Sequence, residues 1–314
     1  MADVVKKATR HGYSEGLVEL AAQHEDIICL DADLGSATGS QAFRKAYPDR
    51  YIEAGIAEQD LIGMAAGLAR TGLSPFANSF AVFAAGRAFE IIRNSVCYPN
   101  LNVKIVGSHC GITPAGDGGS HQCIEDVAAM RALPNMTVLS PCDFNQAKLM
   151  VKLLYEHKGP CYMRTSREPM PIVTSLEDKI EIGKAQILRH GSDVCVVATG
   201  VMTALAVSAV DELAAEGVNA ELVNIHTIKP LDMDTIAASV KKCGGKVLVC
   251  AEATMYGGLG EAVAYGRVGT DGIKFDHVAV MDRFGQSGLS GELLEEYGIT
   301  SANIKAHAAA LAKR

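Results

Sequence analysis

Short apolar runs that alternate with amphipathic stretches are the feature that most constrains the fold of this chain. Residues 27–35, IICLDADLG, form an apolar run that ends in polar residues, which is typical of a strand buried in a parallel sheet. Strands alternating with helices predict a parallel sheet covered by helices. Further strands are expected over residues 103–108, 137–141 and 161–166, with helices over 3–23, 58–70 and 87–95, between the last two strands, and from 125.

The stretch from 172 to 193 interrupts this alternation. Its charge and short alternating segments predict a linker followed by an antiparallel edge strand. The alternation then restarts, with strands expected over 194–200, 220–225, 246–252 and 277–282 and helices over 204–216, 234–242 and from 257. We therefore predict an α/β protein of two domains, residues 1–177 and 185–314, each a mostly parallel sheet flanked by helices.

Composition excludes several classes of protein. Hydrophobic residues make up 48% and charged residues 21% of the 314 residues, so a packed core is expected rather than disorder. The net charge of −7 and the lack of a Lys/Arg cluster argue against a general nucleic-acid binder. No apolar stretch reaches membrane-spanning length, and the N-terminus has no signal-peptide core.

The nine cysteines are scattered without metal-ligand spacing. Several lie inside apolar runs, such as Cys195 in VCVVATG and Cys250 in KVLVCAE. We expect buried free thiols in a reducing cytoplasm.

One carboxylate stands directly before a small and apolar run, Glu58 in GIAEQDLIGMAAGLA. An acidic residue is mildly favoured at a helix N-terminus, so Glu58 could simply be exposed there. Alternatively, it faces an apolar pocket, where burial raises the pKa of its carboxyl group and lets it share a proton with a ligand.

A long Gly-rich loop follows the strand expected at 103–108 and contains His109, Asp117 and His121. Parallel sheets bind ligands at such strand ends, and a loop of this length is usually functional or mobile. Within it, Gly116-Asp117-Gly118 and the later Asn145 form a weak match to a GDG…N pattern for Mg²⁺ and a diphosphate.

Two further segments offer candidate ligand contacts. Phe80 and Phe83 are three residues apart, which suits either core aromatics on a helix or an aromatic binding pocket. The expected strand at 161–166 is followed by SREPMP, so the guanidinium groups of Arg164 and Arg167 could bind a phosphate or lie at the surface. GGLGEA at 257–262 lacks a complete phosphate-binding pattern.

Taken together, these segments resemble the C-terminal half of transketolase, and specifically the separate C-terminal subunit of split transketolases. The resemblance runs over nearly the whole chain. The segments that carry it are LDADLG, GIAEQDLIGMAAGLA, FAVFAAGRAFEIIRN, SHCGITPAGDGGSHQ, MRALPNM, SREPMP, HTIKPLD and DRFGQSG. Single motifs are shared with deoxyxylulose-phosphate synthase and with 2-oxoacid dehydrogenase β subunits, but the SH…GDGGSHQ loop favours transketolase.

The resemblance implies a role for Glu58 in activating thiamine diphosphate. In that family the glutamate of the IAEQ segment contacts N1′ of the aminopyrimidine and favours the imino tautomer, which removes the proton from thiazolium C2. Apolar neighbours such as Ile56 and Ile62 would help this carboxyl to hold its proton.

The resemblance also implies which residues surround the cofactor. Phe80 and Phe83 match the aromatic pocket for the pyrimidine, and Asp33 and Leu34 match a segment that approaches the cofactor near a subunit boundary. Gly86 stands where some members carry Tyr, which leaves the width of the pocket open.

The substrate residues implied by the resemblance lie in the Gly-rich loop and after the 161–166 strand. His109, Asp117 and His121 match residues that bond the carbonyl and hydroxyl oxygens of the sugar, and Arg167 matches the arginine that binds its phosphate. Cys110 replaces an Asp that is often found there, which leaves substrate preference open. It is also open whether Ser36 or Thr38 supplies the family's phosphate-binding serine.

A whole cofactor site would need a second chain. In the family a different, N-terminal domain binds the diphosphate and its Mg²⁺, so we expect no metal ligands here and an N-terminal partner subunit in an α₂β₂ assembly. The apolar face near residues 63–69 would be an interface. The expected activity is transfer of a two-carbon ketol unit between sugar phosphates. The alternatives are a 2-oxoacid dehydrogenase E1 β-type subunit and a non-catalytic scaffold.

Overall fold

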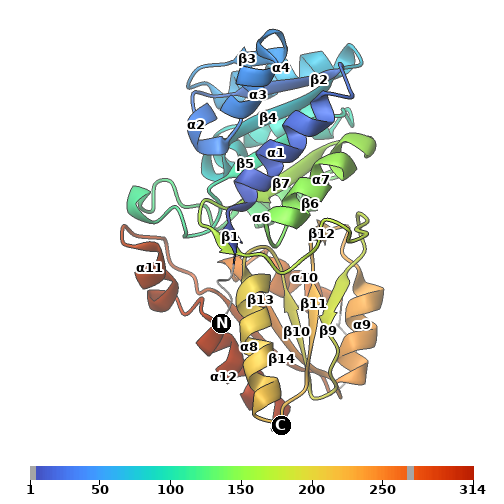
Figure 1. The fold of residues 1–314 in the computed structure, drawn as a ribbon, viewed down its shortest axis with the longest axis vertical. Coiled ribbons are helices and arrows are strands. Elements are labelled where there is room, and N and C mark those ends of the chain that lie inside the picture. The colour runs from blue at the N-terminus through green and yellow to red at the C-terminus, as the bar shows by residue number, and fades with distance from the viewer. Residues whose placement is uncertain (1–4, 267–271) are drawn as a thin grey trace.

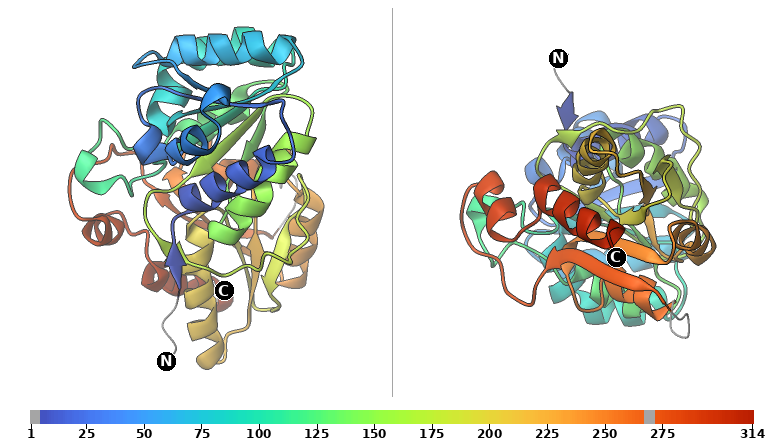
Figure 2. Two further views of the ribbon diagram at one scale, coloured as in Figure 1. Left: turned by 45° about the horizontal axis from the view of Figure 1, so that its top comes forward. Right: turned by 90° about the horizontal axis from the view of Figure 1, so that it is seen from below.

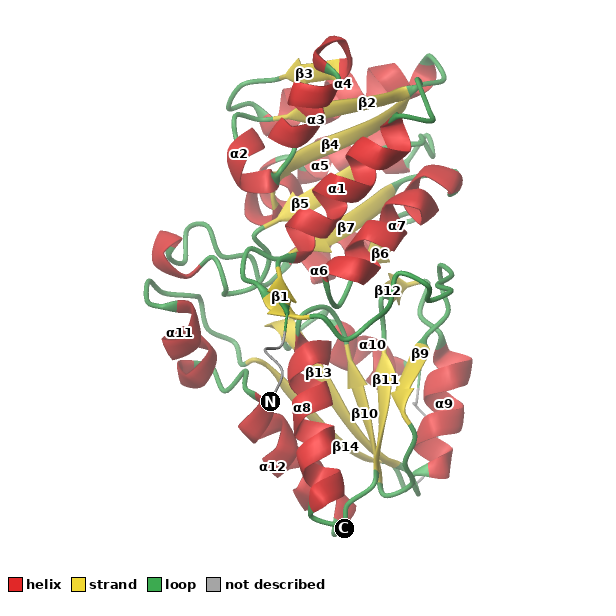
Figure 3. Ribbon diagram, viewed as in Figure 1, coloured by secondary structure: helices red, strands yellow, loops and turns green. Residues whose placement is uncertain are grey.

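The computed structural model describes residues 5–266 and 272–314. They form two sheets that lie one above the other along the long axis of the molecule, each with helices on both faces (Figure 1, Figure 3). The predicted fold class, two domains built on mostly parallel sheets flanked by helices, is confirmed.

The first sheet has the strand order β12-β6-β7-β5-β4-β2-β3. All its neighbouring strands are parallel except β12 and β6. Its strands are β2 (Ile27–Asp31), β3 (Tyr51–Glu53), β4 (Ser74–Phe80), β5 (Lys104–Ser108), β6 (Thr137–Leu139), β7 (Cys161–Thr165) and β12 (Thr227–Lys229). The last of these comes from the expected second domain, so that domain extends the sheet of the first.

Helices cover both faces of the first sheet because each presents one apolar side to it. One face is covered by α1 (Thr9–Ala21), α3 (Gln41–Ala46) and α7 (Phe144–Glu156). The other is covered by α4 (Glu58–Arg70), the π-helical turns η2 (Val82–Arg87) and η3 (Ile92–Cys97), α5 (Phe89–Ile91) and α6 (Asp126–Ala132). Short turns are α2 (Gly35–Thr38), η1 (Pro48–Arg50) and η4 (Ala115–Asp117).

The second sheet has the order β14-β13-β10-β11-β9, and only β9 is antiparallel to its neighbour. Its strands are β9 (Gln186–Arg189), β10 (Val194–Ala198), β11 (Ala220–Asn224), β13 (Lys246–Thr254) and β14 (Lys274–Val280). The antiparallel edge strand predicted between 172 and 193 is confirmed as β9. Helices α8 (Met202–Ala215) and α12 (Ser301–Ala312) pack on one face, with α9 (Met233–Lys242) and α10 (Leu259–Tyr265) on the other.

The two sheets are joined by packing as well as by the chain. One hydrophobic cluster contains Ile105 and Val138 of the first sheet together with Val223 and Val249 of the second. A two-stranded ribbon, β1 (Lys6–Lys7) with β8 (Met170–Pro171), lies between the sheets, and α11 (Ser290–Glu296) lies at the side of the molecule (Figure 1). Among the described helices, none has both the length and the apolar character needed to cross a bilayer.

Candidate active site

The predicted site residues gather at the carboxyl edge of the first sheet. Asp33, Phe80, His109 and Arg167 lie at or just after the ends of β2, β4, β5 and β7, and these strands are parallel neighbours. Asp33 and His109 have positive φ values of 61° and 59°, a strained conformation for residues other than glycine that often occurs at functional sites.

Four rings form a cluster at this edge. The Phe80 and His109 rings stack with centroids 4.0 Å apart, and Phe83 lies 5.9 Å from Phe80. His121 meets Phe83 edge to face at 5.4 Å. Phe83 is brought here by the π-helical turn η2, which follows β4 directly, and π turns occur frequently at functional sites. The cluster provides an aromatic wall suited to a flat heteroaromatic ring.

Glu58 is the first residue of α4 and is only 1% exposed. Its Oε2 accepts a hydrogen bond of 2.6 Å from Nη1 of Arg87, whose guanidinium lies 5.1 Å from the centre of the Phe83 ring. Glu58 is therefore buried beside the aromatic wall, but its carboxylate is ion-paired. The sequence predicted an apolar surround instead.

Ile56 is the expected apolar neighbour of Glu58 that does not surround it. This side chain is 75% exposed and does not shield Glu58 within this chain, whereas Ile62 is fully buried. A buried carboxylate without a partner is strongly disfavoured, and Arg87 of η2 supplies that partner.

Two arginines form the cationic side of the site. Arg167 donates to the carbonyl of Pro114 at 2.9 Å and to Oδ2 of Asp117 at 3.2 Å. Arg10 donates to the carbonyl of Ala37 at 2.7 Å, and its Nε is buried without a partner among the residues that the structure describes. Burial, followed by the charge of Arg167, lowers the pKa of Arg10. The second cation was missed from the sequence because a single arginine at the start of a helix carries no distinguishing pattern.

His109 is held in its neutral form. Burial and the positive charges of Arg10, Arg167 and His121 lower the pKa of its imidazole to about 3. Arg10 Nη1 lies 3.4 Å from Nε2 of His109, and Ser108 Oγ lies 2.9 Å from Nδ1. Because a guanidinium can only donate, Nε2 accepts and we assign the proton to Nδ1.

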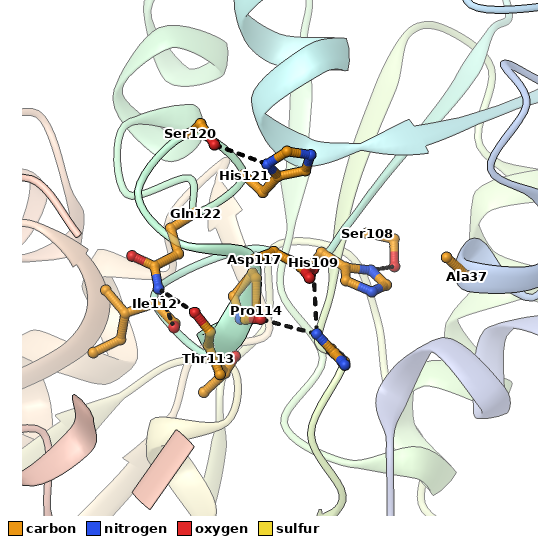
Figure 4. Close-up of polar contacts among 12 residues, drawn as sticks. Ala37, Ser108, His109, Ile112, Thr113, Pro114, Asp117, Ser120, His121 and Gln122 are labelled. Carbon is orange, nitrogen blue, oxygen red and sulfur yellow. Dashed lines mark hydrogen bonds and ion pairs between the residues drawn. The ribbon is translucent and has the colours of Figure 1, made fainter. Parts of the chain in front are cut away.

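The Gly-rich loop is closed at its neck and carries hydrogen bonds within it (Figure 4). Gly111 and Cys123 form a β-bridge, with hydrogen bonds of 2.7 and 3.0 Å in the two directions. Inside it, Nε2 of Gln122 donates to the carbonyl of Ile112 at 3.1 Å. The loop therefore has a defined shape that places Asp117 against Arg167.

The weak GDG…N pattern does not form one site. Asp117 pairs with Arg167, while Asn145 lies on α7 and donates to the carbonyl of Thr174. Over residues 5–266 and 272–314, no group of three or more His, Cys, Asp or Glu side chains could hold a metal ion.

The segment after β2 surrounds one buried carboxylate. Asp31 accepts from the hydroxyls of Thr38 and Ser40 and from the N–H of Leu34. Thr38 is buried and occupied by this bond, whereas Ser36 is exposed next to Ala37, the residue that Arg10 contacts.

Four further positions singled out in the sequence have different surroundings. The exposed Asp33 donates its N–H to Glu53. Cys110 is buried, and Gly86 is exposed with open space where a side chain would be. Arg164, the other candidate phosphate ligand, is buried in an ion pair with Asp126 at 2.8 Å.

Comparison with known proteins agrees over both parts of the chain. Residues 5–172 match the family described as "Transketolase, pyrimidine binding domain" and residues 183–304 match "Transketolase, C-terminal domain". The chain is 45% identical over 304 residues to a protein of Methanocaldococcus jannaschii named as a transketolase C-terminal section, covering 96% of this chain and 95% of that protein.

Two more relatives cover nearly the same length. One is a 6-deoxy-6-sulfo-D-fructose transketolase subunit of a Clostridium species, 41% identical over 295 residues, which are 94% of this chain and 91% of that protein. The other is a solved structure described as a split-gene transketolase in an inactive β4 tetramer, with a TM-score of 0.88, 43% identity and 98% coverage of both chains.

Proposed function

The chain belongs to the transketolase family, and we propose that it is the C-terminal subunit of a split, thiamine diphosphate-dependent transketolase. The observation that carries this proposal is the position of Glu58, a buried carboxylate beside an aromatic wall at the carboxyl edge of the first sheet. The reaction would be transfer of a two-carbon ketol unit from a ketose to an aldose.

Glu58, Phe80 and Phe83 fit the aminopyrimidine end of the cofactor. The rings would stack on or border the pyrimidine, and the carboxyl group of Glu58 would hold a proton at N1′. When bound, thiamine diphosphate would supply the electron sink for the transfer. Asp33 and Leu34 would approach it from the end of β2. Oε2 of Glu58 accepts from Arg87, so either Oε1 serves the cofactor or this guanidinium moves when the cofactor binds.

The other end of the cofactor would be bound by a partner. The described residues offer no cluster for Mg²⁺, and relatives of similar length are named as a C-terminal section and as a split-gene transketolase. We therefore propose an N-terminal partner subunit that binds the diphosphate and Mg²⁺, in an α₂β₂ assembly. The cysteines of the described residues are buried, which is consistent with a cytoplasmic enzyme.

The substrate would lie between the loop and the two arginines. His109 and His121 would hydrogen-bond the carbonyl and hydroxyl oxygens of the sugar, and Asp117 would bond the hydroxyl next to the carbonyl. Arg167, together with Arg10, would bind the anionic end, because guanidinium groups suit phosphate. A sulfonate presents similar oxygens, and one relative is named for a sulfonated sugar, so the anionic group could be either.

The two neighbouring arginines, Arg10 and Arg167, favour ketol transfer between charged sugars over a 2-oxoacid dehydrogenase subunit and over a non-catalytic scaffold. A 2-oxoacid dehydrogenase β subunit would not need the contact of Asp117 to a hydroxyl group. A scaffold would not need a half-exposed Phe83 beside a buried Glu58. The pairing of these features supports a working site.

The proposal is tested by replacing Glu58 in the complex of this chain with its partner. We expect Glu58→Gln to lower kcat for ketol transfer by about 100-fold or more, the usual contribution of a positioned acid or base. Glu156→Gln is the matched control, because Glu156 is an exposed glutamate at the end of α7, on the other face of the first sheet. Near-normal turnover in Glu58→Gln, or no ketol transfer by the wild-type complex with any ketose donor, would refute the proposal.

A further inference from the structure

Glu252 lies on β13 of the second domain but contacts the active-site loop of the first. Its Oε1 accepts two hydrogen bonds, from the backbone N–H of Ile112 at 2.8 Å and of Thr113 at 3.0 Å. The side chain is 2% exposed. These two N–H groups lie at the neck of the loop, next to the bridge between Gly111 and Cys123.

Burying the carboxyl group of Glu252 costs free energy. Burial raises the pKa of Glu252 to about 7, against the opposing effects of Arg164 and of the two N–H donors. An uncompensated buried carboxyl group is strongly disfavoured. A carboxyl group at this position is therefore not explained by packing alone, because an apolar side chain would pack there without that cost.

The neighbouring residues are also arranged around this carboxyl group. A Cβ on Gly111 would lie 2.2 Å from Cδ and Oε1 of Glu252, so only glycine allows the approach. Arg164 donates to the backbone carbonyl of Glu252 at 3.1 Å and is held by Asp126. The arginine fixes the strand on which Glu252 lies, and its charge offsets that of the carboxyl group.

A second segment of the C-terminal domain packs on the same loop. Nε2 of Gln122 donates to the carbonyl of Gln286 at 2.9 Å. A Cβ on Gly119 would lie 2.6 Å from the carbonyl oxygen of Gly285, so the two backbones are in close contact. Figure 1 and Figure 2 show the loop and the segment leading to α11 side by side. The loop is therefore held at its neck by Glu252 and near its far end by residues 285–287.

We propose that Glu252 is a positioning residue for ketol transfer, which holds the neck of the loop so that Asp117 and His121 face the substrate. Glu252 does not touch the substrate and acts through Ile112 and Thr113. This inference rests on the proposed function for its effect on activity, but not for its effect on the loop. It assigns to the second domain a part in shaping the active site.

The test compares Glu252→Gln with Glu252→Met. The two side chains are similar in size, but only glutamine keeps an oxygen acceptor for the two N–H groups. Hydrogen exchange of residues 111–121 is measured on the chain alone, and kcat and KM are measured on the complex with its partner. We expect Met to speed exchange in this segment at least tenfold and to lower kcat/KM for ketol transfer by about 10–100-fold. Gln should stay within about threefold of wild type in both measurements, because it keeps the acceptor.

Cofactor affinity separates positioning from a general loss of structure. Glu58, Phe80 and Phe83 come from α4, β4 and η2 rather than from the loop neck, so we expect thiamine diphosphate to bind the Met complex with a Kd within about threefold of wild type. If Glu252→Met does not fold, Gly111→Ala is used instead. Its added Cβ pushes against the same carboxyl group, so we expect the same faster hydrogen exchange in the loop.

Each outcome decides for or against the inference. Hydrogen exchange at the wild-type rate in the loop of Glu252→Met overturns it. If that variant does not fold, the same result in Gly111→Ala overturns it. Equal loss of activity in Glu252→Gln and Glu252→Met also overturns it. A wild-type complex that lacks ketol transfer refutes the proposed function instead, and the exchange data on the chain alone remain interpretable.

Discussion

At the scale of single residues, His109 is the clearest case of a side chain whose state is set by its surroundings. It is 2% exposed and lies beside Arg10. A positive imidazole there would be both desolvated and repelled. His109 can therefore keep Nε2 as a hydrogen-bond acceptor, for Arg10 or for a substrate hydroxyl group, throughout the neutral pH range without changing its charge.

This state predicts a pH dependence of stability. The folded pKa of about 3 lies below the ordinary value of 6.5, so between these values the unfolded chain binds more protons than the folded chain. The free energy of unfolding contributed by His109 is present above pH 6.5 and is lost as pH falls toward 3. We expect the stability difference between wild type and His109→Gln to shift against wild type from pH 7 to pH 4, measured by urea denaturation. A constant difference would contradict the assignment.

The ion pair between Asp117 and Arg167 is exposed enough to open. Both side chains are 38% exposed, and pairs of this kind contribute little to stability. An anionic group of a substrate can therefore displace Asp117 from Arg167 at small cost. This exchange would free the carboxylate of Asp117 for a sugar hydroxyl group.

Replacement of Arg167 tests which end of the substrate it binds. We expect Arg167→Gln to raise KM for a phosphorylated ketose about 10–100-fold, the loss of a charge-assisted hydrogen bond. KM for an unphosphorylated ketose should change by less than about threefold, since it lacks the anionic partner. Arg189→Gln serves as the control, because Arg189 is an exposed arginine on β9 that also pairs with an aspartate. Equal increases for both donors would remove Arg167 from anion binding.

At the scale of elements, much of the fold could be predicted from the period of the apolar residues. The helix expected over 58–70 is α4, and the strands expected from 103 and from 161 are β5 and β7. The helix is long enough to show its period, and each strand contains consecutive apolar residues, IV in β5 and CYM in β7. The strand β4 was missed, since its Ser, Pro and Asn residues hide a buried strand and Phe80 and Phe83 have helical spacing.

The site was only partly predictable, because some of its residues are brought together by the fold alone. Residues close in the sequence, such as those of the Gly-rich loop, could be grouped before the fold was known. Arg10, Arg87 and Glu252 could not, because they reach the site from α1, η2 and β13 through tertiary packing. The roles predicted for the site residues stay predictions.

The packing of α1 on α7 gives a prediction about stability. A Cβ on Gly12 would lie 2.1 Å from the carbonyl oxygen of Phe144, while one on Gly63 of α4 would meet nothing within 4 Å. We expect Gly12→Ala to force the helices apart and to lower the Tm of the chain by roughly 4–10 °C. Gly63→Ala is the matched control and should keep or raise the Tm, because alanine is favoured in an open helical position. Equal Tm values would show that the α1–α7 contact is not tight.

At the scale of the whole molecule, the two domains share a core, but no element within residues 5–266 and 272–314 covers one face of α4. Gly63 and Gly67 on that helix are open, and Ile56 before it and Tyr98 beyond η3 are 75% and 86% exposed. Small and apolar residues at a surface are characteristic of interfaces. This face lies beside Glu58, the residue proposed to serve the cofactor. A partner subunit docked on this face would supply the diphosphate side of the proposed cofactor site.

This arrangement predicts that thiamine diphosphate binds only when the partner is present. Calorimetry on the chain alone should show a Kd weaker by at least about 100-fold than that of the complex, because the chain would contact only the pyrimidine end of the cofactor. A hundredfold loss of affinity corresponds to about 2.8 kcal/mol. Gly67→Arg should prevent both assembly and tight cofactor binding, since a long charged side chain would be placed in the interface. Ala215→Arg, at the exposed end of α8 far from this face (Figure 1), should change neither. Tight Mg²⁺-dependent binding by the chain alone would place the diphosphate site within this subunit, and normal assembly of Gly67→Arg would move the interface away from α4.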